Sequence, residues 1–352
     1  MDQTEKKVTI NQVATYCGVS KTTISRFLNG KYENMSAGTK ERIAAAIKTL
    51  DFHPDRSAQR LKSNKTKLIG CVIGDISSPF SALLLKGITS VCEDAGYQVL
   101  FADSQESEKR ERRAIQGFLD NRVDGLIVNT CGQDDEYILR LSRQNMPIVL
   151  ADRPLLEPGL VDTVCISNEA ASAMCTRFLF EQGYAHVAFF SESIGRISPR
   201  LLRCRGYKTV CAEQGSEHEV FELEKEDLTR SIAALREFRE RHPGKRIAAL
   251  STNGTTTQHL LVAMKELGIR PGYDFGLCTF DDWTWLNIAE PGITAVSKRT
   301  TEIGERAAKL LLRRISGKCG ADVPPQTEIV SYDLIVRDST PGSGQAKHPT
   351  SI

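Results

Sequence analysis

Apolar residues at the start of the chain recur at the three- and four-residue spacing of short helices. One apolar stripe is formed by Val8, Ile10, Val13, Ala14 and Cys17. Gly18 then supplies a turn, and Ser20 is placed to cap a second helix. The inward side of that helix carries Val19, Ile24, Phe27 and Leu28. Helices this short cannot bury their apolar faces alone, so the pattern predicts two helices that pack on neighbouring elements.

A third amphipathic helix is predicted over residues 36–52, so that residues 1–52 form a three-helix domain. Residues 53–66 join this domain to the rest of the chain and begin with a helix-start signal. Their only apolar side chains are Ala58 and Leu61. A linker helix with so small an apolar face is expected to be mostly unfolded on its own.

From residue 67 the pattern changes, because short apolar, β-rich runs alternate with helical segments in two successive series. Apolar strands that alternate with helices indicate parallel sheets covered on both faces, so two series predict two similar α/β lobes. The expected core spans residues 67–338. Its N-lobe comprises about 67–161 and 297–322, its C-lobe about 162–296 and 323–338, and residues 339–352 form a disordered tail.

Charge is unevenly distributed along the 352-residue chain, which is long enough for two or three domains. Residues 1–65 hold 12 Lys and Arg against 6 Asp and Glu, whereas the remainder is slightly acidic. A basic head on a mildly acidic body is typical of a nucleic-acid-binding module joined to another function. The alternative is a solvated helical hairpin with ordinary surface charges.

The remaining composition argues against an exported protein, a membrane protein or an enzyme. The ten cysteines form no C-x-x-C pair and lie mostly in apolar runs, so we expect buried free thiols and no metal site. No signal-peptide pattern and no membrane-length apolar run occurs, which favours a soluble cytoplasmic protein. No P-loop, G-x-S-x-G, H-E-x-x-H or dinucleotide glycine fingerprint occurs, so neither catalysis nor a cofactor is expected.

The order of helix-turn-helix domain, linker and two-lobed core resembles that of the lac repressor (LacI/GalR) family of transcription regulators. The most specific part is VTINQVATYCGVSKTTISRFLNG, followed by TKERI and FHPDRSAQRL, and the resemblance covers about residues 8–338. It implies an all-α helix-turn-helix DNA-binding domain and an α/β core like that of periplasmic binding proteins. It also implies a homodimer that reads a palindromic operator in double-stranded DNA and binds a small effector between the core lobes.

Position by position, the resemblance assigns DNA contacts to the second helix and its surroundings. The base-reading positions are Lys21, Thr22 and Arg26, where the fork of an arginine can grip a guanine. The backbone-contacting positions are Thr9, Ser20, Thr23, Ser25, Asn29 and Thr39, whose hydroxyl and amide groups suit phosphates. Ser20 and Thr39 also fit purely structural roles at helix starts. Leu61 matches the leucine that two paired linker helices push into the minor groove.

Two features depart from the family pattern. Asp55 stands where the family most often has an amide, and a carboxylate near phosphates is unfavourable unless Arg56 compensates for it. The loop NGKYENMS is one residue longer than in the lac repressor, so contacts from that loop cannot be transferred.

Ligands of parallel α/β lobes bind at the carboxyl ends of strands, which places the expected effector site between the lobes. The residues expected there are Ser77, Phe80, Arg153, Arg203, Phe221, Asn253 and Asp281. The resemblance identifies Arg203, Asn253 and Asp281 with ligand-binding positions of the family, although Gly254 replaces the usual aspartate after the asparagine. Asp281 could instead cap a helix, and Arg203 could form a surface salt bridge.

The expected effector follows from charge. The cations Arg153, Arg200, Arg203 and Lys298 or Arg299 would gather near the cleft, which favours an anionic ligand. The whole sequence also loosely resembles regulators of keto-deoxygluconate and hexuronate use. We therefore predict a regulator, most often a repressor in this family, of carbohydrate or sugar-acid catabolism, with an effector such as 2-keto-3-deoxygluconate. The alternatives are a neutral sugar or a purine as ligand, and an intracellular solute-binding protein as function.

Overall fold

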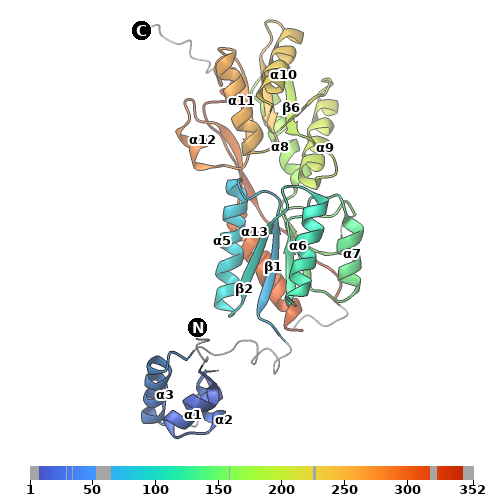
Figure 1. The fold of residues 1–352 in the computed structure, drawn as a ribbon. Helices are drawn as coiled ribbons and strands as arrows, with labels where there is room; N and C mark the ends of the chain where they lie inside the picture. Colours follow the sequence, from blue (N-terminus) through green and yellow to red (C-terminus); the bar gives the residue numbers. More distant parts are fainter. Residues whose placement is uncertain are drawn as a thin grey trace, which may run out of the picture. The chain divides into compact units, whose positions relative to one another are not determined.

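The computed structural model describes residues 8–28, 30–33, 35–52, 65–157, 159–224, 227–317 and 323–343. The chain divides into two compact units, Met1–Thr66 and Lys67–Ile352 (Figure 1). This division falls where the sequence predicts the end of the linker. Within the described ranges, none of the helices combines the length and the apolar character needed to cross a lipid bilayer. The nine cysteines in these ranges are buried and form no disulfide, as predicted.

The first unit contains three short helices, α1 (Ile10–Cys17), α2 (Lys21–Leu28) and α3 (Ala37–Thr49). Gly18 ends α1 with φ 60°, a left-handed conformation that glycine adopts without strain, and so turns the chain into α2. The apolar faces of the three helices meet in one small core. That core consists of Val13, Ala14, Cys17, Ile24, Ile43, Ala46 and Phe52.

The N-lobe of the second unit is built on a six-stranded sheet in which every pair of neighbours is parallel. In sheet order its strands are β11 (Thr327–Ile329), β5 (Asp162–Cys165), β4 (Ile148–Ala151), β3 (Gly125–Val128), β1 (Leu68–Ile73) and β2 (Gln98–Asp103). Its helices are α5 (Pro79–Asp94), α6 (Glu108–Asp120), α7 (Asp135–Arg143) and α13 (Thr300–Ile315). In Figure 1, α5 and α6 lie on opposite sides of β1, which explains why β1 is buried along its whole length.

The C-lobe repeats this architecture. In sheet order its strands are β12 (Tyr332–Ile335), β10 (Thr294–Lys298), β9 (Gly276–Phe280), β8 (Ile247–Ser251), β6 (His186–Glu192) and β7 (Glu219–Leu223). Its helices are α8 (Asn168–Glu181), α9 (Ser198–Glu213), α10 (Leu228–Arg241), α11 (Gly254–Glu266) and the short α12 (Thr284–Ile288). All neighbouring strands are parallel except β10 and β12, which pair antiparallel.

The chain passes between the lobes three times, and this corrects the predicted lobe boundaries. β5 pairs with β4 and β11 pairs with β5, so 162–165 and 327–329 belong to the N-lobe and not to the C-lobe. The last strands before the three crossings, β5, β10 and β11, each run parallel to an earlier strand of the same sheet and finish at the carboxyl ends of the strands in that sheet. The chain therefore leaves each lobe at that end of the sheet. β12 enters the C-lobe there and must run opposite to its neighbour, which explains the antiparallel pair.

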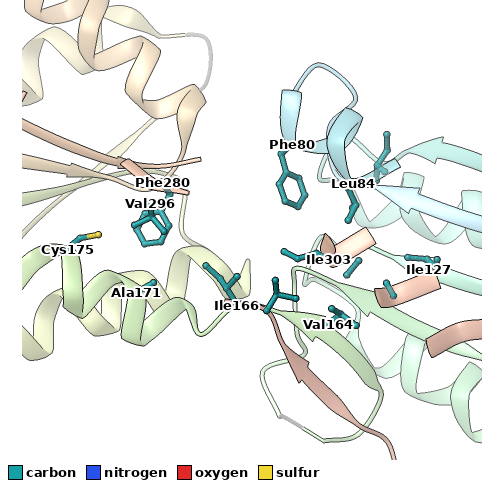
Figure 2. Packing of buried hydrophobic residues seen from close by; sticks show 14 of the residues in the cluster. Phe80, Leu84, Ile127, Val164, Ile166, Ala171, Cys175, Phe280, Val296 and Ile303 are labelled. Carbon is teal, nitrogen blue, oxygen red and sulfur yellow. The ribbon is translucent and has the colours of Figure 1, made fainter. Parts of the chain in front are cut away.

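Close helix packing joins the returning segment to the N-lobe. α13 crosses α5 at a point where one glycine on each helix faces the backbone of the other helix. A Cβ at Gly304 would lie 3.1 Å from Ile88 N, and a Cβ at Gly87 would lie 2.9 Å from Glu305 N. The largest hydrophobic cluster continues across both lobes, with Phe80 and Leu84 on one side and Cys175 and Phe280 on the other (Figure 2).

The predicted tail begins later than expected. Ser339 and Thr340 are fully buried, because the Ser339 hydroxyl donates to Leu277 O and accepts from Thr294 N. Residues 339–343 are therefore part of the C-lobe, and residues 344–352 lie outside the described part of the chain.

Candidate functional site

The exposed face of α2 carries the side chains that the sequence assigns to base reading. Ile24 is completely buried and fixes the orientation of the helix. Thr22 and Arg26 are four residues apart on the opposite side, and both are exposed, as is Lys21. Among the described residues, neither Lys21 nor Arg26 forms an ion pair. The face therefore presents two cations and a hydroxyl to the surroundings.

The hydroxyl residues around this face lie at helix starts. Thr9 caps α1 in a reciprocal pair with Gln12, whose side chain accepts from Thr9 N at 2.7 Å. Ser20 Oγ accepts from Thr23 N at 3.1 Å at the start of α2. Ser36 caps α3 through Thr39 N at 3.3 Å. Helix starts direct unpaired backbone N–H groups and a partial positive charge outward, which suits phosphates.

The remaining residues expected to contact DNA are placed only in part. Ser25 is half-buried on α2. Asn29 and the wedge residue Leu61 lie outside the described residues, as does almost all of the predicted linker 53–66.

A second candidate site lies at the carboxyl ends of the core strands, between the two lobes. Its cavity has a volume of about 70 Å³. Five of the residues predicted for the effector site line it, namely Phe80, Arg153, Arg203, Asn253 and Asp281. The other lining residues are Asp75, Ser78, Ser81, Glu106, Asn129, Asp152, Glu192, Ile197, Pro199, Arg200, Thr255, Trp283 and Lys298.

Lys298 connects the lobes at the base of this cleft. Its Nζ lies 3.2 Å from Asp152 Oδ1 at the end of β4 and 3.0 Å from Asp281 Oδ1 at the end of β9. Both aspartates have φ 68°, a left-handed conformation that aspartate tolerates better than most residues. Burial alone would raise the pKa of Asp152, but Lys298 and two nearby guanidinium groups outweigh this effect and hold the pKa below its usual value.

Arg203 is buried and only partly satisfied. Its Nε donates to Asn168 Oδ1 at 2.8 Å, its Nη1 donates to Thr252 O, and its guanidinium stacks 3.9 Å from the centre of the Phe280 ring. Arg203 Nη2 has no hydrogen-bond partner among the described residues. Burial lowers the pKa of Arg203. Asp281 Oδ1 is likewise without a hydrogen bond there, since its contact with Lys298 is an ion pair without hydrogen-bond alignment.

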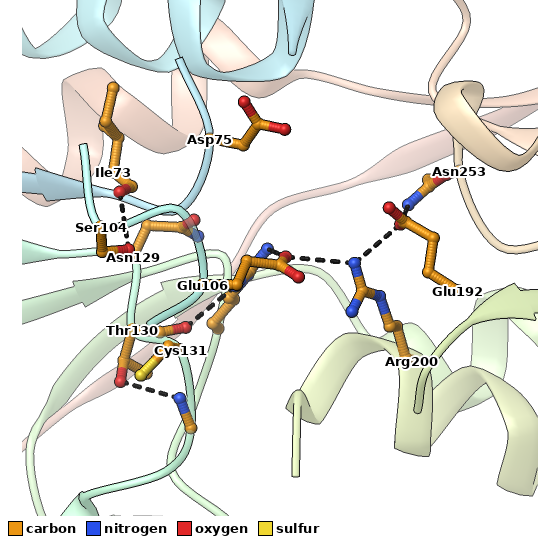
Figure 3. Close-up of polar contacts among 12 residues, drawn as sticks. Ile73, Asp75, Ser104, Glu106, Asn129, Thr130, Cys131, Glu192, Arg200 and Asn253 are labelled. Carbon is orange, nitrogen blue, oxygen red and sulfur yellow. Dashed lines mark hydrogen bonds and ion pairs between the residues drawn. The ribbon is translucent and has the colours of Figure 1, made fainter. Parts of the chain in front are cut away.

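A chain of polar contacts crosses the cleft mouth, as Figure 3 shows. Asn253 caps α11 by accepting from Thr256 N at 2.8 Å, and its Nδ2 donates to Glu192 at 2.6 Å. Arg200 pairs with Glu192 at 2.7 Å and with Glu106 at 3.1 Å. Glu106 in turn pairs with Arg153 at 2.7 Å. Asn253 thus has both a structural role and a place in the cleft.

Two predicted effector residues do not line the cleft. Ser77 is exposed and donates its N–H and hydroxyl to Asp75 Oδ1 at 2.9 and 2.6 Å, so it is Asp75 that lines the cleft. Phe221 stacks on Phe190 with ring centres 5.0 Å apart and packs against the hydrophobic core of the C-lobe. The sequence identified the strand β7 correctly but not the face to which its aromatic residue points.

Trp283 is a lining residue that the sequence analysis missed. A Cβ at Gly254 would lie 2.5 Å from Cη2 of the Trp283 ring and closer to two other ring atoms. Gly254 therefore makes room for the indole, which is 7 % exposed. The glycine that replaces the usual aspartate was the available signal, but only the fold reveals the indole beside it.

The electrostatics of the cleft differ from the expected surplus of cations. Four cations line the cleft, but five carboxylates line it as well. Arg299, which was expected as an alternative to Lys298, points away from the cleft toward Glu302 and Asp333. Every lining cation except Arg203 is ion-paired with a lining carboxylate. Few of the cationic hydrogen-bond donors that line the cleft are therefore available to a ligand. Arg203 Nη2 is the buried donor among them.

Comparison with known proteins agrees with this architecture. Residues 9–55 match the family described as bacterial regulatory proteins, lacI family, and residues 176–340 match a periplasmic binding protein-like domain. The HTH-type transcriptional regulator KdgR of Bacillus subtilis (strain 168) is 34 % identical over 96 % of this chain and 99 % of its own length. The HTH-type transcriptional regulator PtxS of Pseudomonas plecoglossicida is 32 % identical over 97 % and 98 %.

Solved structures show the same fold. The lac repressor dimer bound to operator and the anti-inducer ONPF has a TM-score of 0.82 at 22 % identity, covering 96 % of this chain and 100 % of that one. The transcriptional regulator CelR in complex with cellobiose has a TM-score of 0.67 at 26 % identity, covering 95 % and 100 %. These relatives are named as regulators and not as enzymes. The chain therefore belongs to the LacI family of bacterial DNA-binding transcriptional regulators.

Proposed function

We propose that this regulator represses genes of sugar-acid catabolism by binding a palindromic operator as a homodimer, under the control of an anionic sugar in the interlobe cleft. The observation that supports the cleft most strongly is Arg203 Nη2, a buried donor without a hydrogen-bond partner among the described residues. Leaving a buried donor unpaired is costly, so the site is suited to a ligand that supplies an acceptor. A sugar acid has hydroxyl oxygens that can accept from Arg203 and a carboxylate for the arginines at the cleft mouth.

Two aromatic rings support the same ligand class. Phe80 and Trp283 both line the cleft, and the C–H face of a sugar ring packs well on such surfaces. Lys298 lies 4.2 Å from the centre of the Phe80 ring, which holds this ring in place. The name of one relative, CelR in its cellobiose complex, supports a saccharide as the ligand. That the saccharide carries a carboxylate is our inference from the arginines of the cleft.

Calorimetry on the full-length protein tests the ligand class with 2-keto-3-deoxygluconate, D-glucose and hypoxanthine as probes. We expect the sugar acid to bind the parent and to bind Arg203→Lys at least about tenfold more weakly, because lysine lacks the second donor of the fork. The matched control is Arg299→Lys, which lies outside the cleft and should leave the affinity unchanged. Preferential binding of glucose or hypoxanthine would contradict the proposal.

We further propose that Arg26 reads a base while the capped hydroxyls and helix starts hold phosphates. The test is Arg26→Lys, which keeps the charge and removes the planar fork. Fluorescence anisotropy, at one salt concentration, compares a selected operator with scrambled DNA. We expect the operator preference to fall by about 1–3 kcal/mol while binding to scrambled DNA changes little. An equal loss on both DNAs would show that Arg26 contacts only the backbone.

A further inference from the structure

Glu106 occupies an unusual position, because one of its oxygen atoms is shared by arginines of both lobes. Glu106 Oε1 accepts from Arg153 Nη2 at 2.7 Å and from Arg200 Nη2 at 3.1 Å. Arg153 follows β4 in the N-lobe, whereas Arg200 lies on α9 in the C-lobe. Glu106 therefore joins the lobes at the mouth of the cleft, where Figure 3 shows it between the two lobes.

The backbone holds this carboxylate in place at some conformational cost. Gln105 and Glu106 have φ 49° and 54°, so two successive residues with side chains adopt the left-handed conformation. The turn is fixed because Glu106 N donates to Gly74 O at 3.0 Å and Gln105 N donates to Asp103 Oδ1 at 3.2 Å. Backbone strain of this kind persists where the surroundings impose it and is frequent at ligand sites.

Each of the two arginines also has partners besides Glu106. Arg153 Nη1 donates to Thr130 O at 3.1 Å, and Arg200 Nη1 donates to Ser193 O at 3.0 Å. Arg200 Nη2 also contacts Glu192 at 2.7 Å. The cavity of about 70 Å³ is far below the roughly 300–1,000 Å³ of typical small-molecule sites. A sugar-sized ligand therefore has to displace side chains at the mouth.

We propose that Glu106 is an internal counter-anion that ties Arg153 to Arg200 across the cleft and that the carboxylate of an anionic effector replaces it on binding. This inference rests on the proposed ligand class. It makes Glu106 a residue that determines specificity, because only a ligand with its own negative charge can take over both arginines. A neutral ligand that displaced Glu106 would leave Arg153 without a carboxylate partner and Arg200 with Glu192 alone.

The first experiment needs no effector. Hydrogen–deuterium exchange of the full-length protein compares the parent with Glu106→Gln and with the matched control Glu108→Gln. Glu108 is exposed, and within the described part of the chain its one ion pair is with Arg112 on its own helix. We expect faster exchange in Glu106→Gln at loops 130–133 and 193–197, which contact each other across the cleft through Arg196 Nε and Gly132 O at 3.1 Å. Exchange equal to that of the parent would overturn the tie between the lobes.

The second experiment measures specificity by calorimetry with 2-keto-3-deoxygluconate and D-glucose. We expect Glu106→Gln to bind the sugar acid about tenfold more tightly than the parent, with Glu108→Gln unchanged, because the acid no longer competes with an internal carboxylate. Weaker binding of the acid would overturn the proposal and identify Glu106 as a direct ligand contact. If no sugar acid binds either protein, the proposed ligand class is wrong, and the exchange experiment still decides whether Glu106 ties the lobes.

Discussion

The contact between Gly254 and Trp283 offers a direct test of the cleft geometry through Gly254→Ala. The new Cβ would lie 2.5 Å from Trp283 Cη2, whereas unstrained carbon contacts are about 3.5–4.0 Å long. The indole must therefore move by about 1 Å or more, in a place where it is 7 % exposed. Gly254 is the first residue of α11, so alanine is conformationally acceptable there and even favours the helix.

The two effects oppose each other, and their sizes decide the sign. Overpacking of a buried site costs about 1–3 kcal/mol, while replacing glycine by alanine in a helix gains at most about 1 kcal/mol. The net expectation is a destabilisation of about 1–2 kcal/mol. For a unit of this size 1 kcal/mol corresponds to roughly 2–4 °C, so the melting temperature of the core should fall by about 2–8 °C.

Thermal unfolding followed by circular dichroism measures this change. Gly117→Ala is the matched control, because Gly117 is a helical glycine in the same unit whose Cβ would meet nothing within 4 Å. That control should raise the melting temperature slightly. Adding Trp283→Leu to Gly254→Ala should recover most of the loss by removing the clashing ring. A melting temperature for Gly254→Ala as high as that of Gly117→Ala would refute the proposed contact.

Two further predictions follow from the same cleft. Lys298→Met should destabilise the core by about 3–5 kcal/mol at pH 7, since it leaves two buried aspartates without their cation. In the parent, the lowered pKa of Asp152 stabilises the fold above about pH 4, and this contribution is lost as the pH falls further. In Lys298→Met the buried Asp152 carboxylate has lost its main cation, so burial favours its protonation and acidification from pH 7 to 5 should recover stability; a variant that only loses stability would contradict this. The chain has two tryptophans, Trp283 and Trp285, and Trp283 lines the cleft. Effector binding should therefore change the fluorescence of Trp285→Phe but not that of Trp283→Phe, and the reverse pattern would place the ligand elsewhere.

The sequence predicted those features that depend on local pattern. The three helices of the head follow from helical spacing, a left-handed glycine and hydroxyl caps, all of which act within a few residues. The alternation of apolar strands with helices was enough to predict two parallel-sheet lobes. The rule that ligands bind at strand carboxyl ends then placed Phe80 and Arg153 in the cleft, and the family resemblance placed Arg203, Asn253 and Asp281 there.

Other features are decided by contacts between residues far apart in the chain. β5 joins the N-lobe by pairing with β4, and β11 joins it by pairing with β5, which lies 164 residues earlier in the chain (Thr163 with Thr327). A short apolar run holds no information on which of the two sheets it will join. Phe221 has the same local pattern whether it faces a ligand or the core, and packing on Phe190 decides this. The sequence also showed the cations of the cleft but not their neutralisation. Glu106 reaches Arg200 only when the lobes come together, and Glu192 reaches it only when α9 packs beside the end of β6. Local spacing thus determines which elements form, whereas the partner of each buried charge is determined only by the folded chain, since Coulomb and hydrogen-bond energies depend on distance in space and not along the sequence.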